Sequence, residues 1–588
     1  MAASNLKRLS ETRVLKDYYK QEMHLLKDIA ADFSRENPSL SRTMFGSQAD
    51  PDAARILEGV AFLTANIRQE LDSQFPKLLH SLAQQVCPQY IRPLPAATIM
   101  AFEPRASLTQ ALPISAGTYV DSTESDGGVC RFKTTDQVEL LPLKLDRVVE
   151  REENADDEYS FTLHFELINQ TLDQLEFNKL RIHLAGEYSD ASDLYFMLCH
   201  QLASVSVASE GEVSLQAKDV KGTGFSPEQS LFPQPKGMMP AYDLLQQYFL
   251  FPQKYMFVDV DLSSWKSRGS GNAFAITFNC AKPGFRLPKL STEHFVLYAT
   301  PAVNLFEQES QSVLISAKTD EYQLLPTNMS AGSEQQIYSI DKVESIARGM
   351  AEPREYQSFG GFYDPNNEKT VYEMNYRPGS KPSAPELFLK LAFPQGQAVA
   401  EKEILQAKLT CSNGDQAENL AVGEICVATS NTPELATFRN ITAPTSARRI
   451  PLDGKMLWQL VSHLSLNYLS ITDADTLKAI LRQYVAPDEK DKTGRLINDK
   501  KIEAITNVTV QAGESLFGNA FIRGQNIRIQ LKSENFASKG DKYLFGSVME
   551  QFLVGTAAIN VYSELTIEDF FSGECLEWPA KIGNRPLQ

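Results

Sequence analysis

The sequence predicts a multidomain α+β protein: an N-terminal helical bundle segment, then mainly antiparallel β domains, then a mixed α/β C-terminal domain. Apolar residues recur at steps of three and four near the N-terminus, and the period changes to two from Ala96. Helical and alternating patterns mix after Pro451. At 588 residues the chain is too long for one core, and about one domain per 150 residues predicts roughly three or four domains. The predicted regions are 1–95, 96–310, 311–450 and 451–588.

The composition bounds the class of protein. Apolar residues make up 43%, which is enough to build cores, and the net charge of −17 makes nucleic acid and anionic lipid poor partners. The N-terminus lacks the apolar core of a signal peptide, and no apolar run reaches the length of a membrane span. The scattered cysteines never form a CxxC pair, which favours a reducing compartment. We therefore expect a cytoplasmic protein without direct membrane insertion.

Residues 11–36 are predicted to form the first helix. Leu15, Tyr19, Glu22, Leu26, Ile29 and Phe33 follow a heptad seam, which favours packing against another helix. Glu22 is the polar residue on this seam. It either lies at the seam edge with its carboxylate toward water, or it pairs with a basic residue on a partner helix.

The stretch 50–94 is predicted to carry a second amphipathic helix. Asp50 and Pro51 form a helix start signal, and Pro76 is expected to end this helix and open another short one. Few residues elsewhere in this region can cover both apolar stripes, so we expect a partner to cover them. The predicted partner-binding residues are Leu15, Tyr18, Tyr19, Glu22, Leu26, Ile29, Phe33, Ile56, Val60, Phe62, Leu63 and Ile67.

The β regions are predicted from alternation. Residues 159–168 and 180–184 read as half-buried strands, with His164 and His183 on the polar side. Short helices are expected after a cap at Ser189 or Asp190, and over 242–250. Residues 348–384 are rich in Gly, Pro and polar groups and are predicted to form a long loop.

The last region mixes both patterns. Helices are predicted over 458–471, 475–484 and 544–554, and strands over 505–510, 521–531 and 557–565. The charged residues 487–501 are predicted to form a loop.

The sequence contains no catalytic motif that we could identify: no phosphate-binding GxxxxGK[ST] loop, no GxSxG elbow and no HExxH pair. Asp259 and Asp261 share one face of a predicted strand. Paired carboxylates can bind a metal or act as acid and base, but they are also typical of the solvated face of an antiparallel strand. We expect no catalytic residue, no cofactor and no metal site.

Several stretches resemble the TssF (VasA/ImpG) family of type VI secretion baseplate subunits. The match extends in order over essentially the full length. In the stretch 50–93 it is carried by Asp50, Pro51, Arg55, Glu58, Gly59, Ala61, Phe62, Leu63, Arg68, Leu71, Asp72, Pro88, Tyr90, Arg92 and Pro93. Further along the chain it is carried by YDLLQQYFLFPQKYMFVDVDL (242–262), the TPxxNLF turn (300–306), LTCSNGDQ (409–416), WQLVSHLSLNYLSI (458–471) and the tail EWPAKIGNRPL (577–587).

The resemblance implies a structural role. TssF proteins build the baseplate wedge with TssG, in which a second TssF copy is expected, and join TssK and TssE. The resemblance implies that the assembled baseplate surrounds the VgrG spike, nucleates the Hcp tube and sheath, and docks on the cytoplasmic side of the inner-membrane complex. Two alternatives stay open: a wedge protein of a contractile phage tail, and a soluble hydrolase with an acidic site at Asp259 and Asp261.

Overall fold

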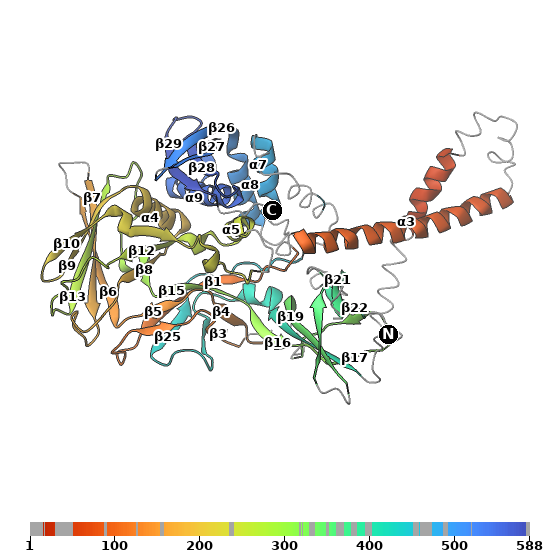
Figure 1. Cartoon of the computed structure of the whole chain (residues 1–588), viewed down its shortest axis with the longest axis horizontal. Coiled ribbons are helices and arrows are strands. Elements are labelled where there is room, and N and C mark those ends of the chain that lie inside the picture. Colours follow the sequence, from red (N-terminus) through yellow and green to blue (C-terminus); the bar gives the residue numbers. More distant parts are fainter. Residues whose placement is uncertain are drawn as a thin grey trace.

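The computed structural model describes a β-rich body from which one long helix projects (Figure 1). Most helices and strands lie in the body, and the predicted change from helical to alternating period marks where the arm joins it. The residues that the structure describes are 16, 18–29, 51–86, 91–124, 128–152, 158–234, 240–316, 319, 321–327, 335–347, 352–359, 370–377, 385–393, 403–450, 458, 473–485, 492–518 and 520–583.

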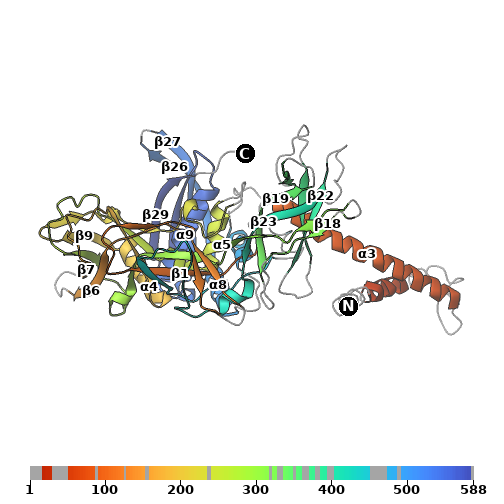
Figure 2. The same ribbon diagram turned by 90° about the horizontal axis from the view of Figure 1, so that it is seen from below.

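The projecting helix, α3 (Pro51–Val86), is continuous over 36 residues. The prediction that Pro76 ends it is wrong. A proline inside a helix removes one backbone hydrogen bond and costs about 3 kcal/mol, but the many remaining bonds of so long a helix can offset that cost. The arm is therefore one rod, and Figure 2 shows it leaving the body beside the sheet that contains β19 and β22 (Gln336–Ile346 and Glu386–Ala392).

Three sheets form the first part of the body, and their neighbouring strands pair antiparallel. Their shared core includes Phe161, Phe278 and Phe102, all buried. Six strands follow the order β24 (Ile425–Ala428), β3 (Tyr119–Ser122), β4 (Arg131–Thr134), β15 (Ala299–Val303), β1 (Ala97–Pro104), β25 (Ala436–Asn440). Five follow β10 (Glu212–Leu215), β9 (Leu202–Ala208), β13 (Ala273–Ala281), β7 (Glu158–Leu167), β6 (Leu143–Glu152). Four follow β11 (Val220–Thr223), β12 (Phe257–Asp261), β8 (Lys179–Leu184), β14 (Phe295–Leu297), and β2 (Leu112–Ile114) pairs with β5 (Val138–Leu140).

The strands of region 311–450 divide between two sheets. β24 and β25 return to the first sheet, where β25 pairs with β1. The others, together with the strand 306–309 of the preceding region, build a separate sheet whose core includes Val343, Leu389 and Leu409. Their order is β16 (Phe306–Glu309), β23 (Ile404–Ser412), β19, β20 (Arg354–Ser358), β21 (Val371–Arg377), β22, β18 (Glu321–Gln323), with β17 (Val313–Leu314) on β23.

The predicted loop 348–384 is wrong for two of its segments, because β20 and β21 lie within it. Tyr356 and Tyr372 are buried in the core of this sheet. The glycines and prolines around these short strands concealed their alternation.

The C-terminal region is a mixed sheet covered by helices. The order is β26 (Ile505–Phe517), β27 (Ala520–Leu531), β28 (Tyr562–Asp569), β29 (Cys575–Ile582), and β27 and β28 run parallel. α7 (Ala474–Tyr484) and α9 (Lys539–Thr556) confirm two predicted helices, while 459–471 lies outside the described residues. The loop predicted over 487–501 is wrong for α8 (Lys492–Glu503), a helix whose charged residues include Arg495 and Asp499 at i,i+4.

The C-terminal region docks on the first β region through α9. The amide of Gly540 donates to Asp193 Oδ1 at 2.8 Å, and Ser192 Oγ lies 2.9 Å from Ser538 Oγ. Asp193 and Ser192 belong to α4 (Tyr188–His200), and residues of both regions share one hydrophobic core. These contacts position the two regions as one unit.

The alternation of 159–167 and 180–184 is confirmed, but the placement of His183 on a polar side is wrong. Its ring is buried and lies 4.5 Å from the ring of Phe257. The helix cap is also corrected: α4 begins at Tyr188 after Glu187, so Ser189 and Asp190 lie in its first turn. α5 (Pro240–Leu250) confirms the other short helix.

The burial of His183 predicts a pH dependence of stability. Burial lowers the pKa of His183 to about 4, whereas an unfolded histidine titrates near 6.5. Between these values the unfolded chain binds a proton that the folded chain does not, so this stability is present above about pH 6.5 and is lost as the pH falls toward 4. The free energy of unfolding of the wild-type chain is expected to fall by about 2 kcal/mol between pH 7 and pH 5 because of this histidine. Urea unfolding at the two pH values is expected to show that His183→Phe lacks this part of the decrease. His24→Gln, on an exposed histidine, is the control, and equal pH dependence in both variants would contradict this account.

Among the helices of the described residues, none is both long enough and apolar enough to cross a membrane.

Candidate partner-docking site

The apolar stripe of α3 faces solvent. Ile56 is 67% exposed, Val60 41%, Leu63 62% and Ile67 60%. We call these four residues the docking stripe. Phe62 beside it is 49% exposed. Large apolar side chains at helical spacing on a projecting rod are typical of a helix that packs against a partner.

The first helix covers a different face of α3. Residues 16 and 18–29 are helical where described, and Leu15 and Phe33 lie outside the described residues. Tyr18, Tyr19 and Leu26 are half-buried, whereas Ile29 is exposed. Glu22 is buried and accepts a hydrogen bond from Arg68 Nη1 at 2.5 Å. Glu22 therefore pairs with a basic residue of another helix, as the second interpretation expected, and that helix belongs to the same chain.

This ion pair is the feature that joins the two helices. Ala65 and Ala61, about one and two turns before Arg68 on α3, are fully buried, which indicates a close approach on this face. The docking stripe is not used by that contact. The Arg68–Glu22 pair and the docking stripe therefore lie on different faces of α3.

Removing the partner of Glu22 is expected to loosen the first helix. In Arg68→Ala, a buried carboxylate loses its charged donor at a cost of about 1 kcal/mol. Hydrogen exchange of residues 18–29 is expected to become roughly fivefold faster. Arg55→Ala, an exposed arginine of the same helix, is the control. Exchange that is equally slow in the Arg68 variant would show that the ion pair does not hold the helices together.

The base of the arm is fixed on the body. Leu79 and Ala83 are buried, and the ring of His80 lies 6.5 Å from the ring of Tyr376 in β21. Beyond the helix, Arg92 lies over the ring of Tyr338 in β19 at 5.2 Å. The eight-stranded sheet therefore holds the base of the arm.

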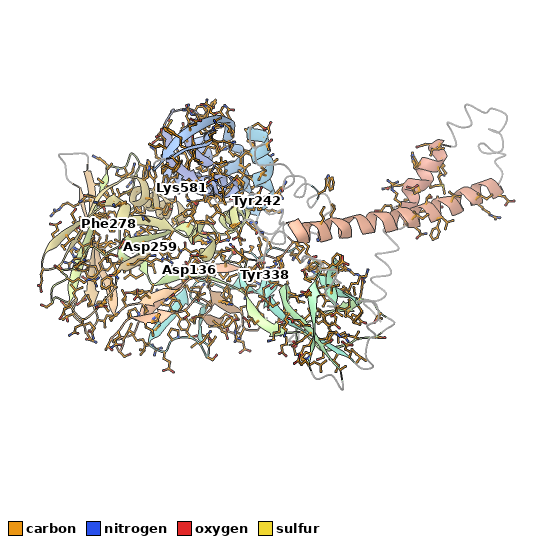
Figure 3. The ribbon with its side chains drawn as sticks, in the orientation of Figure 1. Asp136, Tyr242, Asp259, Phe278, Tyr338 and Lys581 are labelled. Atoms are coloured by element: carbon orange, nitrogen blue, oxygen red, sulfur yellow. The ribbon has the colours of Figure 1, made fainter. Side chains whose placement is uncertain are left out.

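Asp259 and Asp261 lie in the body, away from the arm, where Figure 3 labels Asp259 near Asp136. Arg181 Nε donates to Asp259 Oδ1 at 2.7 Å, and Lys179 also pairs with Asp259. Asp261 accepts from the amide and hydroxyl of Ser263, and these hydrogen bonds lower the pKa of the Asp261 carboxyl. Among the described residues, no group of three His, Cys, Asp or Glu side chains could hold a metal ion.

Two stretches that resemble the family meet inside the body. Asn304, after β15, and Asn413, after β23, exchange hydrogen bonds: Asn304 Nδ2 donates to Asn413 Oδ1 at 2.8 Å, and the Asn413 amide donates to Asn304 Oδ1 at 2.7 Å. Both side chains are buried. This pair links the six-stranded sheet to the eight-stranded sheet, which is a structural role.

A third such stretch also serves the fold. Gln247 is buried in α5, where it accepts from Lys254 and donates to Asp243. Burial lowers the pKa of Lys254 to about 8. The amide of Gln247 stands between the two ionisable groups, and sequence reasoning, which carried no role to this position, missed this bridging contact.

Polar networks that join sheets, together with an arm that exposes apolar residues, are typical of a structural protein. The comparisons agree. The family model described as "Type VI secretion system, TssF" matches residues 12–585. The chain is similar to the type VI secretion system component TssF1 of Pseudomonas aeruginosa strain PAO1, at 25% identity over 97% of this chain and 99% of the relative.

Solved structures agree as well. One chain in the cryo-electron microscopy structure of the type VI secretion system TssK-TssF-TssG baseplate subcomplex matches with a TM-score of 0.78 and 26% identity, covering 90% of this chain and 99% of that one. A chain of the baseplate complex from the type VI secretion system shares the fold, with a TM-score of 0.62 and 20% identity, covering 97% of this chain and 100% of that one. The protein described here belongs to the TssF family, and its function is that of a type VI secretion baseplate subunit.

Proposed function

We propose that this chain is a non-enzymatic wedge subunit that captures TssG through the docking stripe. The observation that carries the proposal is the exposure of Ile56, Leu63 and Ile67 on a helix whose other face is already occupied by the first helix. Covering such side chains removes apolar surface from water, which stabilises association by about 1.5–3 kcal/mol for each side chain that becomes fully buried.

The partners follow from the family. The matched subcomplex contains TssK and TssG, and we propose both as partners of this chain, together with a second copy of it in the wedge. We further propose that the assembled baseplate contacts TssE, the VgrG spike and the Hcp tube, and docks on the cytoplasmic side of the inner-membrane complex. We propose that the other predicted partner-binding residues belong to the same interface, except Glu22, which pairs with Arg68 inside the chain.

One substitution distinguishes the hydrolase alternative from the wedge function. Asp259→Asn removes the charge that Arg181 and Lys179 share and leaves the arm untouched. Affinity capture of co-expressed TssG is expected to be the same for the wild-type chain and for this variant. Failure of the wild-type chain to retain TssG would contradict the wedge function, and an activity lost only in the variant would favour the enzyme.

A further inference from the structure

A pocket where α5 ends, near the first turns of α8, has an unusual charge for this protein. Its volume is about 590 Å³, which is in the range of small-molecule sites. Arg448, Arg495 and Lys501 line it, and none of its described lining residues is an aspartate or a glutamate. The chain as a whole carries a net charge of −17, so this concentration of positive charge departs from its average.

The cations are held in place by contacts behind the pocket. Arg448 donates to the carbonyl oxygens of Tyr484 at 3.2 Å and Phe249 at 3.4 Å. Lys501 is buried and pairs with Asp541 at 2.6 Å, and Arg495 lies 3.6 Å from Asp499. Both carboxylates lie outside the pocket lining. The charge of Lys501 is balanced by the buried Asp541, so the guanidinium groups of Arg448 and Arg495 carry the positive charge of the pocket wall.

The remaining lining supplies neutral donors. Ser446 and Gln253 are half-buried in the wall, and their hydroxyl and amide groups can donate hydrogen bonds. Gly494 and Arg495 belong to the first turn of α8, where the helix dipole favours a negative charge. A fixed guanidinium group recognises phosphate and carboxylate groups through paired hydrogen bonds.

We propose that this pocket binds a small polyanion, either a phosphate-bearing or a polycarboxylate molecule. The pocket lies where the C-terminal region meets the first β region, since Phe249 and Phe251 come from one and Asn498 and Val485 from the other. Binding there stabilises the contact between the two regions. The site is separate from the arm, so it does not depend on the docking function.

The test is isothermal titration of the full-length chain with pyrophosphate and with citrate. One saturable site is expected, about tenfold weaker in Arg495→Ala and weakened by added salt. Ser446→Glu, which places a carboxylate in the wall, is expected to abolish binding. Lys500→Ala, on the same helix but outside the lining, is expected to bind as the wild-type chain does.

The relative affinities of the two probes show which class of anion the pocket binds. Tighter binding of pyrophosphate identifies a phosphate-bearing ligand, and tighter binding of citrate identifies a polycarboxylate. The absence of saturable binding for both probes would overturn the proposal, as would equal affinity in the Arg495 and Lys500 variants. Thermal unfolding checks that each variant is folded, and Arg495→Ala decides the question if Ser446→Glu does not fold.

Discussion

The double variant Leu63→Glu, Ile67→Glu is expected to lose capture of TssG by at least about 100-fold. The two side chains are 62% and 60% exposed on α3, so the charges cost the isolated chain little. In a helical interface, each glutamate would be buried without a partner, and hot-spot losses of about 2 kcal/mol or more per residue are typical. Co-purification of TssG, quantified at fixed ionic strength, is the measurement.

The control is Val422→Glu. Val422 is 57% exposed and lies outside the arm, so the substitution adds one comparable charge without touching the docking stripe. Its capture of TssG is expected to equal that of the wild-type chain. Unchanged capture in the double variant would mean that TssG binds another surface, and the docking stripe would then need a different explanation.

Gly540→Ala is expected to separate the C-terminal region from the first β region. A methyl group at this position would overlap the backbone of Ser192 and Asp193 in α4, and the same close approach brings the Gly540 amide to Asp193 Oδ1. Because backbone atoms cannot move aside cheaply, overpacking here is expected to cost about 3 kcal/mol. Urea unfolding followed by tryptophan fluorescence measures the loss.

Gly59→Ala provides the matched control. Gly59 also lies in a helix, but a methyl group there meets nothing within 4 Å, and alanine stabilises an exposed helix by about 1 kcal/mol relative to glycine. We therefore expect no loss of stability. Equal stability of the Gly540 variant and the wild-type chain would show that α9 does not depend on this close approach.

Alternation was the most informative pattern in the sequence. Tyr159, Phe161 and Leu163 are buried as predicted, because a strand with one buried face must place apolar residues at every second position. The exposure of the docking stripe is consistent with the argument that too few residues surround it to cover it. The spacing of apolar residues, and the number of nearby residues that could cover them, can both be read from the sequence.

Long-range pairing could not be predicted in the same way. The return of β25 to pair with β1 joins residues more than 300 positions apart, and no local pattern encodes that contact. The partner of Glu22 is Arg68, which stood among the residues that resemble the family but carried no sign of its contact. His183 was misplaced because period two says nothing about a second layer that covers the outer face.

Charged composition was the other source of error. Residues 487–501 were predicted to form a loop, yet α8 begins at Lys492, because lysine, arginine and leucine are good helix formers. Ile502 near its end is buried. The same reasoning would have missed the pocket beside α8, whose lining residues come from segments that are distant in the sequence.

The central claim is that the projecting arm assembles this chain with TssG. The most direct test is to co-express the full-length chain with TssG and determine the mass of the purified complex by light scattering. We predict a stable complex with more than one copy of this chain. A monomer that elutes without TssG would contradict the claim, and the docking stripe would then not be the site that makes this chain a baseplate subunit.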